Sequence, residues 1–290
     1  MNRKSVLVTG CSAGGLGYAL ATAFYNAGLH VFATARDPTK VPEPFKDTKK
    51  LAELDNHGEW EVIPLNVTSQ ESLDSCVRQV VEKTGGRGLD VLVNNAGGAI
   101  FGPLAHASIE EARRVYDVNV WGLLAVTKEF VPLLVQAEGV IVNISSIAGA
   151  VPLAWQGIYN SSKAAVTHLS ETFRIELAPL GVRVVTAMVG SVDTQIYQKY
   201  DVAMPADSWY KSVEPFIKNQ SRGKFQEQFN EPIDQVAHNL VADTLKGRQG
   251  KIWRGGDAGM AKYASWLLPT WLFERILHQG RGIYELKRSK

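Results

Sequence analysis

Short runs of apolar residues alternate along the chain with longer segments in which apolar positions recur at helical spacing. The short runs have the length and composition of buried strands, and they fall at residues 5–9, 30–35, 60–65, 89–93, 140–144, 182–189 and 251–254. The longer segments predict helices at residues 16–27, 70–84, 109–137, 159–180 and 231–246, and a loop running into a short helix at 37–50. This alternation predicts an α/β fold: one Rossmann-like, doubly wound parallel sheet of about seven strands with helices on both faces.

Two segments fall outside the alternation. Residues 195–230 follow the sixth predicted strand and are irregular and rich in aromatic residues. We predict a substrate lid there, with a surface insertion as the alternative. Residues 258–290 form an aromatic-rich extension beyond a domain of residues 1–257. Its amphipathic composition fits packing on the domain or on another subunit, and it also fits a membrane interface.

Composition narrows the choice of partners and compartment. The chain has 290 residues, a formal net charge of +2 and 21% charged residues, so no nucleic acid partner is expected. Two cysteines, Cys11 and Cys76, are too few for a disulfide framework and indicate a reducing compartment. An apolar strand begins at residue 5, so no secretory signal is expected, and no apolar run reaches the ~20 residues of a spanning helix. We expect a cytoplasmic protein without a metal site, or one attached peripherally to the endoplasmic reticulum or a lipid droplet.

A glycine-rich turn follows the first predicted strand. The run TGCSAGGLG places Gly10, Gly15 and Gly17 between a strand and a helix, with Ser12 in the same turn. Glycines there let backbone N–H groups and a helix N-terminus approach a pyrophosphate. Within a βαβ unit this turn predicts a dinucleotide site, and an ordinary strand-to-helix turn is the alternative. Cys11 is expected only to fill the turn.

The ends of the next two strands indicate which dinucleotide binds. Arg36 follows the second strand, where an arginine accommodates the 2′-phosphate of NADP and a carboxylate takes the ribose hydroxyl of NAD. Ser12 offers a second contact, whereas Asp37 and a plain surface role for Arg36 leave the assignment open. Asn66, after the third strand, is expected to accept a hydrogen bond from the adenine amino group. The predicted cofactor is NADPH or NADP+.

Polar residues also follow the fourth and fifth strands, at the edge of a parallel sheet where ligands bind. Asn95 lies in the sequence NNAG, and Ser146 follows residue 144. Tyr159 and Lys163 are four residues apart, so they share one face of a helix. An ammonium beside a phenol lowers the phenol's pKa, which predicts proton exchange between Tyr159 and a substrate hydroxyl or carbonyl. Asn119, in YDVNVWG, either satisfies backbone groups at a kink or holds a water behind the lysine.

In this order, TGCSAGGLG, NNAG, Asn119, Ser146 and Tyr159-x-x-x-Lys163 resemble the motifs of the short-chain dehydrogenase/reductase family over residues 5–195. The resemblance implies a nicotinamide cofactor and a tetrad in which tyrosine is the acid/base, serine orients the carbonyl and asparagine supports a proton-relay water. Lysine would bind the ribose and lower the tyrosine pKa. The implied cofactor contacts are Gly10, Ser12, Gly15, Leu16, Gly17, Arg36, Asn66, Val67, Asn95, Ala96, Gly97, Tyr159, Lys163, Gly190, Val192 and Thr194.

Three positions depart from the family pattern. The glycine run is one residue longer than TGxxxGxG, so Gly15 and Gly17 take the two later glycine roles. Asn66 stands where an aspartate is usual. The frequent Pro-Gly after the sixth strand is Val189-Gly190, with Thr194 where a threonine often touches the nicotinamide amide. None of the three removes a catalytic group.

The phrases ARD and IWRG and the aromatic tail resemble the fungal 1-acyldihydroxyacetone-phosphate reductase branch of the family, which reduces lipid ketones with NADPH. Look-alikes in that branch act on polyketide or terpenoid ketones. The leading hypothesis is NADPH-dependent reduction of a bulky, mainly apolar ketone by a homodimer or homotetramer, with an acyl-dihydroxyacetone phosphate as the alternative substrate. A phosphate would need basic partners, and the lid offers Lys199, Lys211, Lys218, Arg222 and Lys224. A non-catalytic nucleotide-binding scaffold and a lipid-anchoring protein are the competing classes; the intact tetrad disfavours the scaffold.

Overall fold

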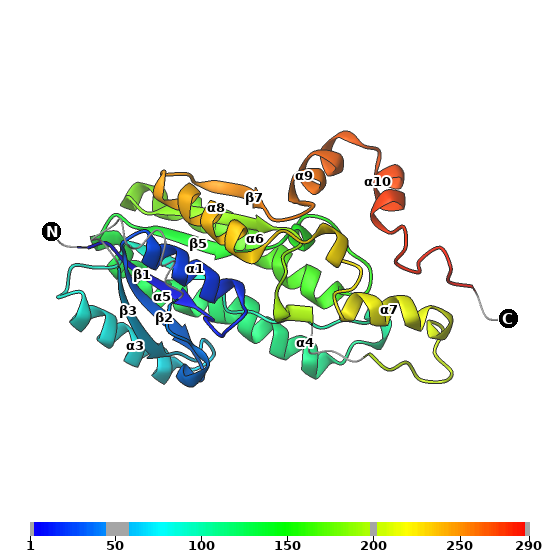
Figure 1. Ribbon diagram of the computed structural model, residues 1–290, viewed down its shortest axis with the longest axis horizontal. Helices are drawn as coiled ribbons and strands as arrows, with labels where there is room; N and C mark the ends of the chain where they lie inside the picture. Colours follow the sequence, from blue (N-terminus) through cyan, green and yellow to red (C-terminus); the bar gives the residue numbers. More distant parts are fainter. Residues whose placement is uncertain (1–2, 45–57, 198–201, 288–290) are drawn as a thin grey trace.

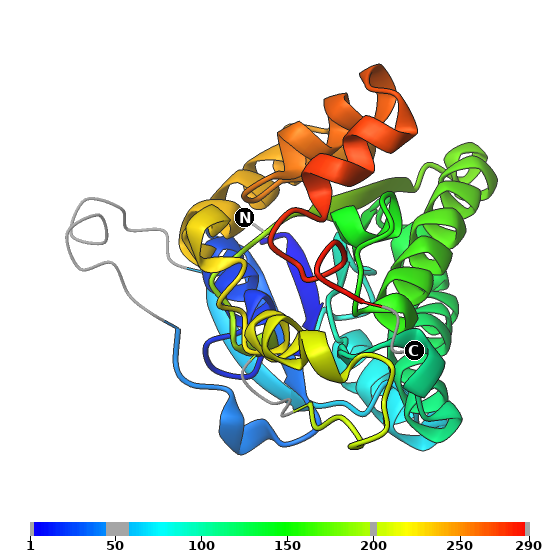
Figure 2. The same ribbon diagram turned by 90° about the vertical axis from the view of Figure 1, so that its right-hand side faces the viewer.

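A single parallel sheet forms the centre of the computed structural model, which describes residues 3–44, 58–197 and 202–287. Its strand order is β3-β2-β1-β4-β5-β6-β7, and helices cover both faces (Figures 1 and 2). The predicted α/β fold is therefore confirmed. The strands are β1 (Ser5–Thr9), β2 (His30–Ala35), β3 (Glu59–Pro64), β4 (Val91–Asn94), β5 (Val140–Ile144), β6 (Arg183–Val189) and β7 (Gly250–Arg254).

Two apolar cores hold the helices to the sheet because neighbouring residues of a strand point to opposite faces. Val6 and Val8 face α1 and α8, whereas Leu7 between them belongs to the core under α3 and α5. All three side chains are fully buried. The helices flanking the sheet are α1 (Leu16–Asn26), α3 (Gln70–Lys83), α5 (Leu123–Gln136), α6 (Gly157–Leu177) and α8 (Ile233–Leu245).

The long helix expected at residues 109–137 has three parts. A π-helical segment, Asp117–Gly122, separates α4 (Ile109–Tyr116) from α5 and carries Asn119. Within the described residues, Ile109–Gln136 is the one helical run long and apolar enough to cross a membrane by length and composition. Phe130 on α5 is fully buried in the core under the sheet, so this run behaves as a core helix.

The predicted lid is more regular than its sequence indicates. It contains α7 (Glu214–Ser221), preceded by a 3-10 turn, Lys211–Val213, and followed by another, Glu227–Phe229. Lys199 lies outside the described residues. So does the short helix expected near residue 50, although a 3-10 turn, Pro38–Lys40, forms at the start of that loop.

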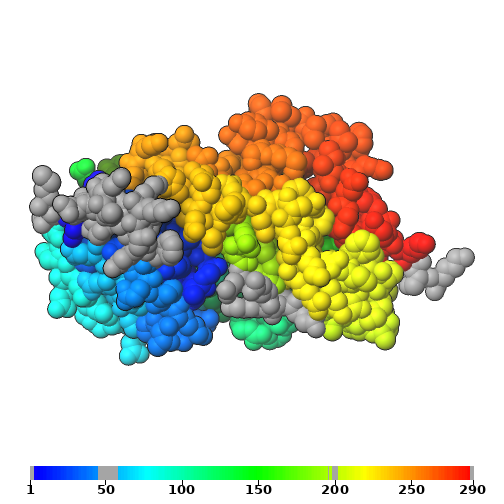
Figure 3. Space-filling model, in the orientation of Figure 1, coloured from blue at the N-terminus to red at the C-terminus, as the bar shows by residue number. Residues whose placement is uncertain are grey.

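The C-terminal extension folds into α9 (Ala258–Leu267) and α10 (Thr270–Leu277) and then crosses toward α7. Phe273 packs with Val151 and Leu153, just before the helix that carries Tyr159. Figures 1 and 3 show the extension and the lid adjoining at one end of the molecule. The other side of α9 and α10 is exposed and apolar, with Tyr263, Trp266, Leu267 and Trp271.

Candidate active site

A cavity of about 600 Å³ runs along the carboxyl edge of the sheet, past the ends of β3, β2, β1, β4, β5 and β6. This edge is where ligands bind in open α/β sheets. Most of the site residues expected from the sequence line it: Gly10, Ser12, Gly15, Leu16, Arg36, Asn66, Val67, Asn95, Ala96, Gly97, Ser146, Tyr159, Lys163, Gly190, Val192 and Thr194. Gly17 and Asn119 are not part of the lining.

The glycine turn is bound tightly to the NNAG loop. The Asn95 amide donates to the carbonyls of Thr9 (2.9 Å) and Gly10 (3.2 Å), and the N–H groups of Asn95 and Ala96 both donate to the Thr9 hydroxyl (2.9 Å each). A Cβ on Gly10 would lie 2.9 Å from the Cα of Ala96, and one on Gly17 would collide with Gly10 and Asn95. Gly17 thus serves the packing of the turn. The backbone cradle has the space and the N–H groups that a pyrophosphate requires.

The structure separates Arg36 from Asp37. Arg36 lines the cavity and is exposed. Asp37 instead caps the 3-10 turn: its carboxylate accepts from the N–H (3.1 Å) and hydroxyl (2.6 Å) of Thr39 and lies 3.6 Å from the Lys40 ammonium. Thr39 and Lys40 accordingly lower the pKa of Asp37. The cation, and not the carboxylate, therefore faces the position after β2 where the two cofactors differ.

Asn66 lines the cavity, but its side-chain oxygen is occupied. That oxygen accepts from the N–H (3.3 Å) and the hydroxyl (3.0 Å) of Thr68, and an amide oxygen has two lone pairs. The expectation that it accepts a hydrogen bond from adenine is at odds with this geometry. The local turn at the start of α3 takes the oxygen instead.

Ser146, Tyr159 and Lys163 converge in the middle of the cavity. Ser146 follows β5 and its hydroxyl interacts with the phenol of Tyr159 on α6. Lys163, one turn further along α6, donates from its ammonium to the Ile144 carbonyl (2.7 Å), and its nitrogen lies 5.7 Å from the Tyr159 ring centre. The cluster is thus supplied by the end of one strand and one face of one helix.

Burial governs the protonation of this cluster. It raises the pKa of the Tyr159 phenol, an effect reinforced by Tyr197 and opposed by the hydrogen bond with Ser146. The predicted lowering of this pKa is wrong in this structure, because desolvation of the phenol dominates and the net shift is upward. Lys163 is buried as well, and its own pKa falls to about 8. Tyr159 is therefore a neutral phenol at neutral pH.

Asn119 does not line the cavity but holds the backbone of a residue that does. Its side-chain oxygen accepts from the Gly98 N–H (2.8 Å), and its amide donates to the Gly98 carbonyl (2.9 Å) and to the Ser162 hydroxyl (3.0 Å). Gly98 lines the cavity beside the NNAG loop. Of the two roles considered for Asn119, the one shown is satisfaction of backbone groups.

Several lining residues have no signal in the sequence. Ile100, Ile196 and Tyr197 add apolar and aromatic side chains to the lining, and Glu111 and Arg114 reach the cavity from α4. Tyr197 lies within the aromatic segment predicted to form a substrate lid, but the sequence does not distinguish it from the other aromatic residues of that segment. No local pattern distinguishes the others, because their contacts to the cavity depend on how α4 and the lid pack.

Both cysteines are buried. Burial raises the pKa of the Cys11 and Cys76 thiols to about 12. They stay protonated, which agrees with a filling role for Cys11.

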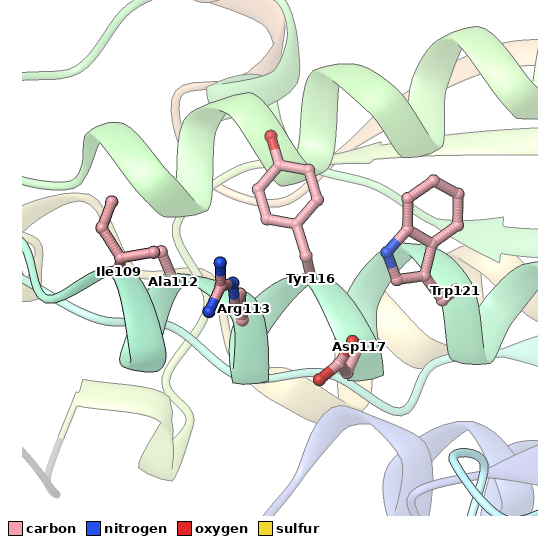
Figure 4. A pocket seen from close by; sticks show the side chains of 6 residues that line it. All are labelled: Ile109, Ala112, Arg113, Tyr116, Asp117 and Trp121. Carbon is pink, nitrogen blue, oxygen red and sulfur yellow. The ribbon is translucent and has the colours of Figure 1, made fainter.

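A second cavity of about 260 Å³ lies on α4 and the adjoining π-helical segment (Figure 4). Ile109, Arg113, Tyr116 and Trp121 line it, and none of the Ser–Tyr–Lys cluster does. Ile109 and Trp121 are both more than half exposed. This surface is separate from the candidate active site.

The glycine cradle and the Ser–Tyr–Lys cluster together define a dinucleotide-dependent oxidoreductase. Residues 4–204 match the family model of the short chain dehydrogenases. The chain is 41% identical to the short-chain dehydrogenase cctT of Talaromyces islandicus over 94% of this chain and 92% of that protein. It is 39% identical to the NADPH-dependent 1-acyldihydroxyacetone phosphate reductase of Schizosaccharomyces pombe over 71% and 68%.

A solved structure shows the same similarity. The alcohol dehydrogenase of the archaeon Thermococcus sibiricus, complexed with 5-hydroxy-NADP, matches with a TM-score of 0.68 and 25% identity over 87% of this chain and 96% of that one. The chain belongs to the short-chain dehydrogenase family and is an NAD(P)-dependent oxidoreductase.

Proposed function

We propose that the protein is an NADPH-dependent reductase of a bulky, mainly apolar ketone. The observation that carries this proposal is the position of Tyr159: its phenol lies beside Ser146 and Lys163, in a cavity that the apolar side chains of Ile100 and Ile196 also line. Apolar pocket walls with a few placed polar groups are typical of small-molecule sites.

The protein side of the reaction follows from this cluster. The bound cofactor supplies a hydride to the carbonyl carbon. Ser146 donates a hydrogen bond to the carbonyl oxygen, and Tyr159 gives that oxygen its proton as the C=O double bond is reduced to an alcohol. Because an alkoxide is a stronger base than a phenolate, a Tyr159 with a raised pKa still donates its proton.

Two features support NADPH over NADH. Arg36 lines the cavity after β2, and Asp37 is bound to Thr39 and Lys40. A relative at 39% identity is named for its NADPH dependence. Lys163 would hold the ribose, and the turn from Gly10 to Gly15 would hold the pyrophosphate.

Reduction of an acyl-dihydroxyacetone phosphate is the second candidate, supported by the name of the Schizosaccharomyces pombe relative. The lid lysines do not favour it. Glu214 binds both Lys211 (2.7 Å) and Lys218 (3.0 Å), and these pairs hold the pKa of Glu214 at about 2. Two of the expected phosphate partners are therefore already paired within the lid.

The test is a panel of ketones offered to the purified protein with NADPH and, separately, with NADH. The panel includes alkyl and steroid ketones, polyketide lactones, an acyl-dihydroxyacetone phosphate and its dephosphorylated form. We expect NADPH oxidation with ketones that have a bulky apolar body, and slower oxidation of NADH with the same ketones. No oxidation with any ketone, or equal use of NADH, would contradict the proposal.

We extend the proposal to a homo-oligomer, a dimer or tetramer, that works in the cytoplasm. The exposed Ile109 on α4 and Trp121 on the π-helical segment offer an apolar surface to a second copy (Figure 4). Light scattering should give a mass of two or four chains, and Trp121→Lys should reduce it. The exposed Trp266 and Trp271 offer a second apolar surface, for a subunit or for the membrane of the endoplasmic reticulum or a lipid droplet; flotation with liposomes separates these occupants.

A further inference from the structure

The C-terminal extension is joined to the loop that leads into the Tyr159 helix. The indole of Trp155 donates to the backbone carbonyl of Arg281 (2.6 Å), and the Ala154 N–H donates to Nε2 of His278 (3.3 Å). Trp155 holds a left-handed backbone conformation, φ 65°, which a bulky residue adopts only when its surroundings enforce it. The extension is therefore part of the active-site architecture.

The lid also forms a hydrogen bond with the loop that contains Ala154 and Trp155. Gln220 on α7 donates to the Ala154 carbonyl (2.7 Å), so the N–H and the C=O of one residue are held by two different segments. Gly282 lies directly against the Phe216 ring, with φ 82°. The lid and the extension thus both contact the loop at Ala154, just before α6 begins.

Arg281 brings a buried cation to this junction. Its side chain is 7% exposed, Nε donates to the Leu277 carbonyl (2.9 Å), and the guanidinium lies 4.1 Å from the centre of the Phe225 ring on the lid. Nη1 is fully buried and has no hydrogen-bond partner, and no described carboxylate forms an ion pair with Arg281. Asp257 and Tyr197 interact with this guanidinium electrostatically without forming an ion pair, and burial still lowers its pKa. Burial of a charge without an ion pair is costly, so the guanidinium is kept here at the expense of stability.

Tyr197 links this cation to the reacting centre. Its side chain lines the cavity together with Tyr159, beside the Phe101 ring at 5.4 Å. Tyr197 interacts electrostatically with Tyr159 and also with Arg281. Within the described part of the chain its hydroxyl makes no hydrogen bond. Tyr197 is therefore the residue that connects the proton donor electrostatically with the buried guanidinium.

We propose that Tyr197 and Arg281 bind an oxyanion, a carboxylate or a phosphate, on the ketone substrate at the end remote from its carbonyl. A guanidinium with unused N–H groups is well suited to such a group, and the neighbouring phenol supplies a further donor. Arg281 does not itself line the cavity and lies against the Phe225 ring, so the oxyanion would reach it only once that ring is displaced. The inference rests on the proposed reductase function and narrows its substrate to an amphiphilic ketone, apolar in its body and charged at one end.

The bland interpretation is that Arg281 only ties the extension to the lid through its stack on Phe225. The two interpretations differ in what they predict for charge. A structural stack treats charged and neutral substrates alike, whereas an oxyanion site distinguishes them.

The experiment compares matched ligands that differ only in charge: a γ-keto fatty acid with its methyl ester, and an acyl-dihydroxyacetone phosphate with its dephosphorylated form. Binding is followed by tryptophan fluorescence in the presence of NADP+, because Trp155 contacts Arg281 directly, and turnover by NADPH oxidation. The proteins are the full-length chain, Arg281→Met, Arg281→Lys, Tyr197→Phe and, as a matched control, Arg275→Met on the exposed surface of α10.

We expect the full-length chain to prefer one of the charged ligands, and the pair concerned identifies carboxylate or phosphate. Arg281→Met should lower the affinity for that charged ligand by about 10²-fold, whereas the affinity for its neutral counterpart should change by no more than a few-fold. Arg281→Lys should recover part of the loss, and Arg275→Met should change neither ligand. Equal losses for both members of a pair, or no preference in the unmutated chain, would overturn the inference.

Because binding is measured separately from turnover, the experiment tests the oxyanion site and the reductase function independently. Charge-selective binding without any turnover would contradict the reductase proposal alone. Turnover of neutral ketones without charge selectivity would contradict the oxyanion site alone. Thermal unfolding of each variant shows whether Arg281→Met has merely lost its fold, and Tyr197→Phe, which removes one hydroxyl, tests the site without disturbing the Phe225 stack.

Discussion

The side chain of Asn119 forms a pair of hydrogen bonds with the backbone of Gly98, accepting from its N–H at 2.8 Å and donating to its carbonyl at 2.9 Å. The pair lies where the helix changes to π-helical winding, and it joins α4 and α5 to the loop after β4. π-helical turns of this kind are frequent at functional sites. Here the π-helical segment directs the side-chain amide of Asn119 toward Gly98 in the cavity wall.

Asn119→Ala should lower the free energy of unfolding by about 1–3 kcal/mol, because it leaves the N–H and C=O of Gly98 without their side-chain partner. It should also slow turnover by loosening the loop beside Tyr159. Urea unfolding and kcat measured on the same preparation check both effects. Ser162→Ala, which removes one of the three Asn119 bonds, is the matched control and should cost less; a larger loss in the control would show that the Gly98 pair is not the important contact.

Tyr159→Phe should leave NADPH binding nearly intact and reduce kcat by at least ~10²-fold, the usual scale of a positioned acid. The change removes only the transferable proton and the contact with Ser146. Cofactor binding is measured by fluorescence titration and turnover by NADPH oxidation with the best ketone of the panel. Activity within a few-fold of the unmutated protein would mean that another group donates the proton.

Arg36→Leu should raise the KM for NADPH about 10- to 100-fold and leave that for NADH nearly unchanged, because a charge-assisted contact to the 2′-phosphate is lost. Steady-state kinetics with both cofactors measure the difference. Asp37→Asn is the matched control: Asp37 is bound to Thr39 and Lys40, so its amide should not change the cofactor preference. Equal KM values for the two cofactors in the unmutated protein would refute the role of Arg36.

NADPH affinity should fall as the pH rises through about 8, where Lys163 loses its proton. The neutral amine no longer carries the positive charge that favours the cofactor. Fluorescence titration between pH 6.5 and pH 9.5 follows this step. Lys163→Arg stays charged throughout the range and should bind with a flat pH dependence, so a step that persists in this variant would have to be assigned to another group.

The same pKa has a consequence for stability, and its sign is fixed. The ammonium of Lys163 is disfavoured in the fold, so the unfolded chain binds more protons between about pH 8 and pH 10.5. The free energy of unfolding of the unmutated protein should therefore rise with pH across that window, relative to Lys163→Met. Denaturant unfolding of both proteins without cofactor at pH 7 and pH 10 gives the difference; a gap that widens with pH in favour of the variant would contradict the buried, depressed lysine.

Local patterns in the sequence were enough to predict the sheet and the Ser–Tyr–Lys cluster. Strands buried on both faces are continuous apolar runs, as in β1, and a spacing of four residues places Tyr159 and Lys163 together on any helix. The pKa of Tyr159 could not be predicted in this way, since spacing shows the neighbouring charge and not the depth of burial. The surroundings of Asn66 could not be predicted either: Thr68, two residues later, donates to the side-chain oxygen expected to accept from adenine.

Arg281 is the clearest residue that no local pattern identifies. It lies 126 residues from Trp155, the side chain that fixes its backbone, and a single arginine in a polar tail resembles any solvated cation. The π-helical winding at Asn119 and the helix α7 within the lid are likewise set by packing between segments far apart in the chain. Sequence periodicity contains no information on those distances.

The family model ends at residue 204, whereas the segment that holds Trp155 from outside begins beyond residue 277. The catalytic cluster and the support of the loop before its helix therefore come from different stretches of the chain. Exchanging that last stretch between relatives would change what holds this loop while leaving Ser146, Tyr159 and Lys163 as they are.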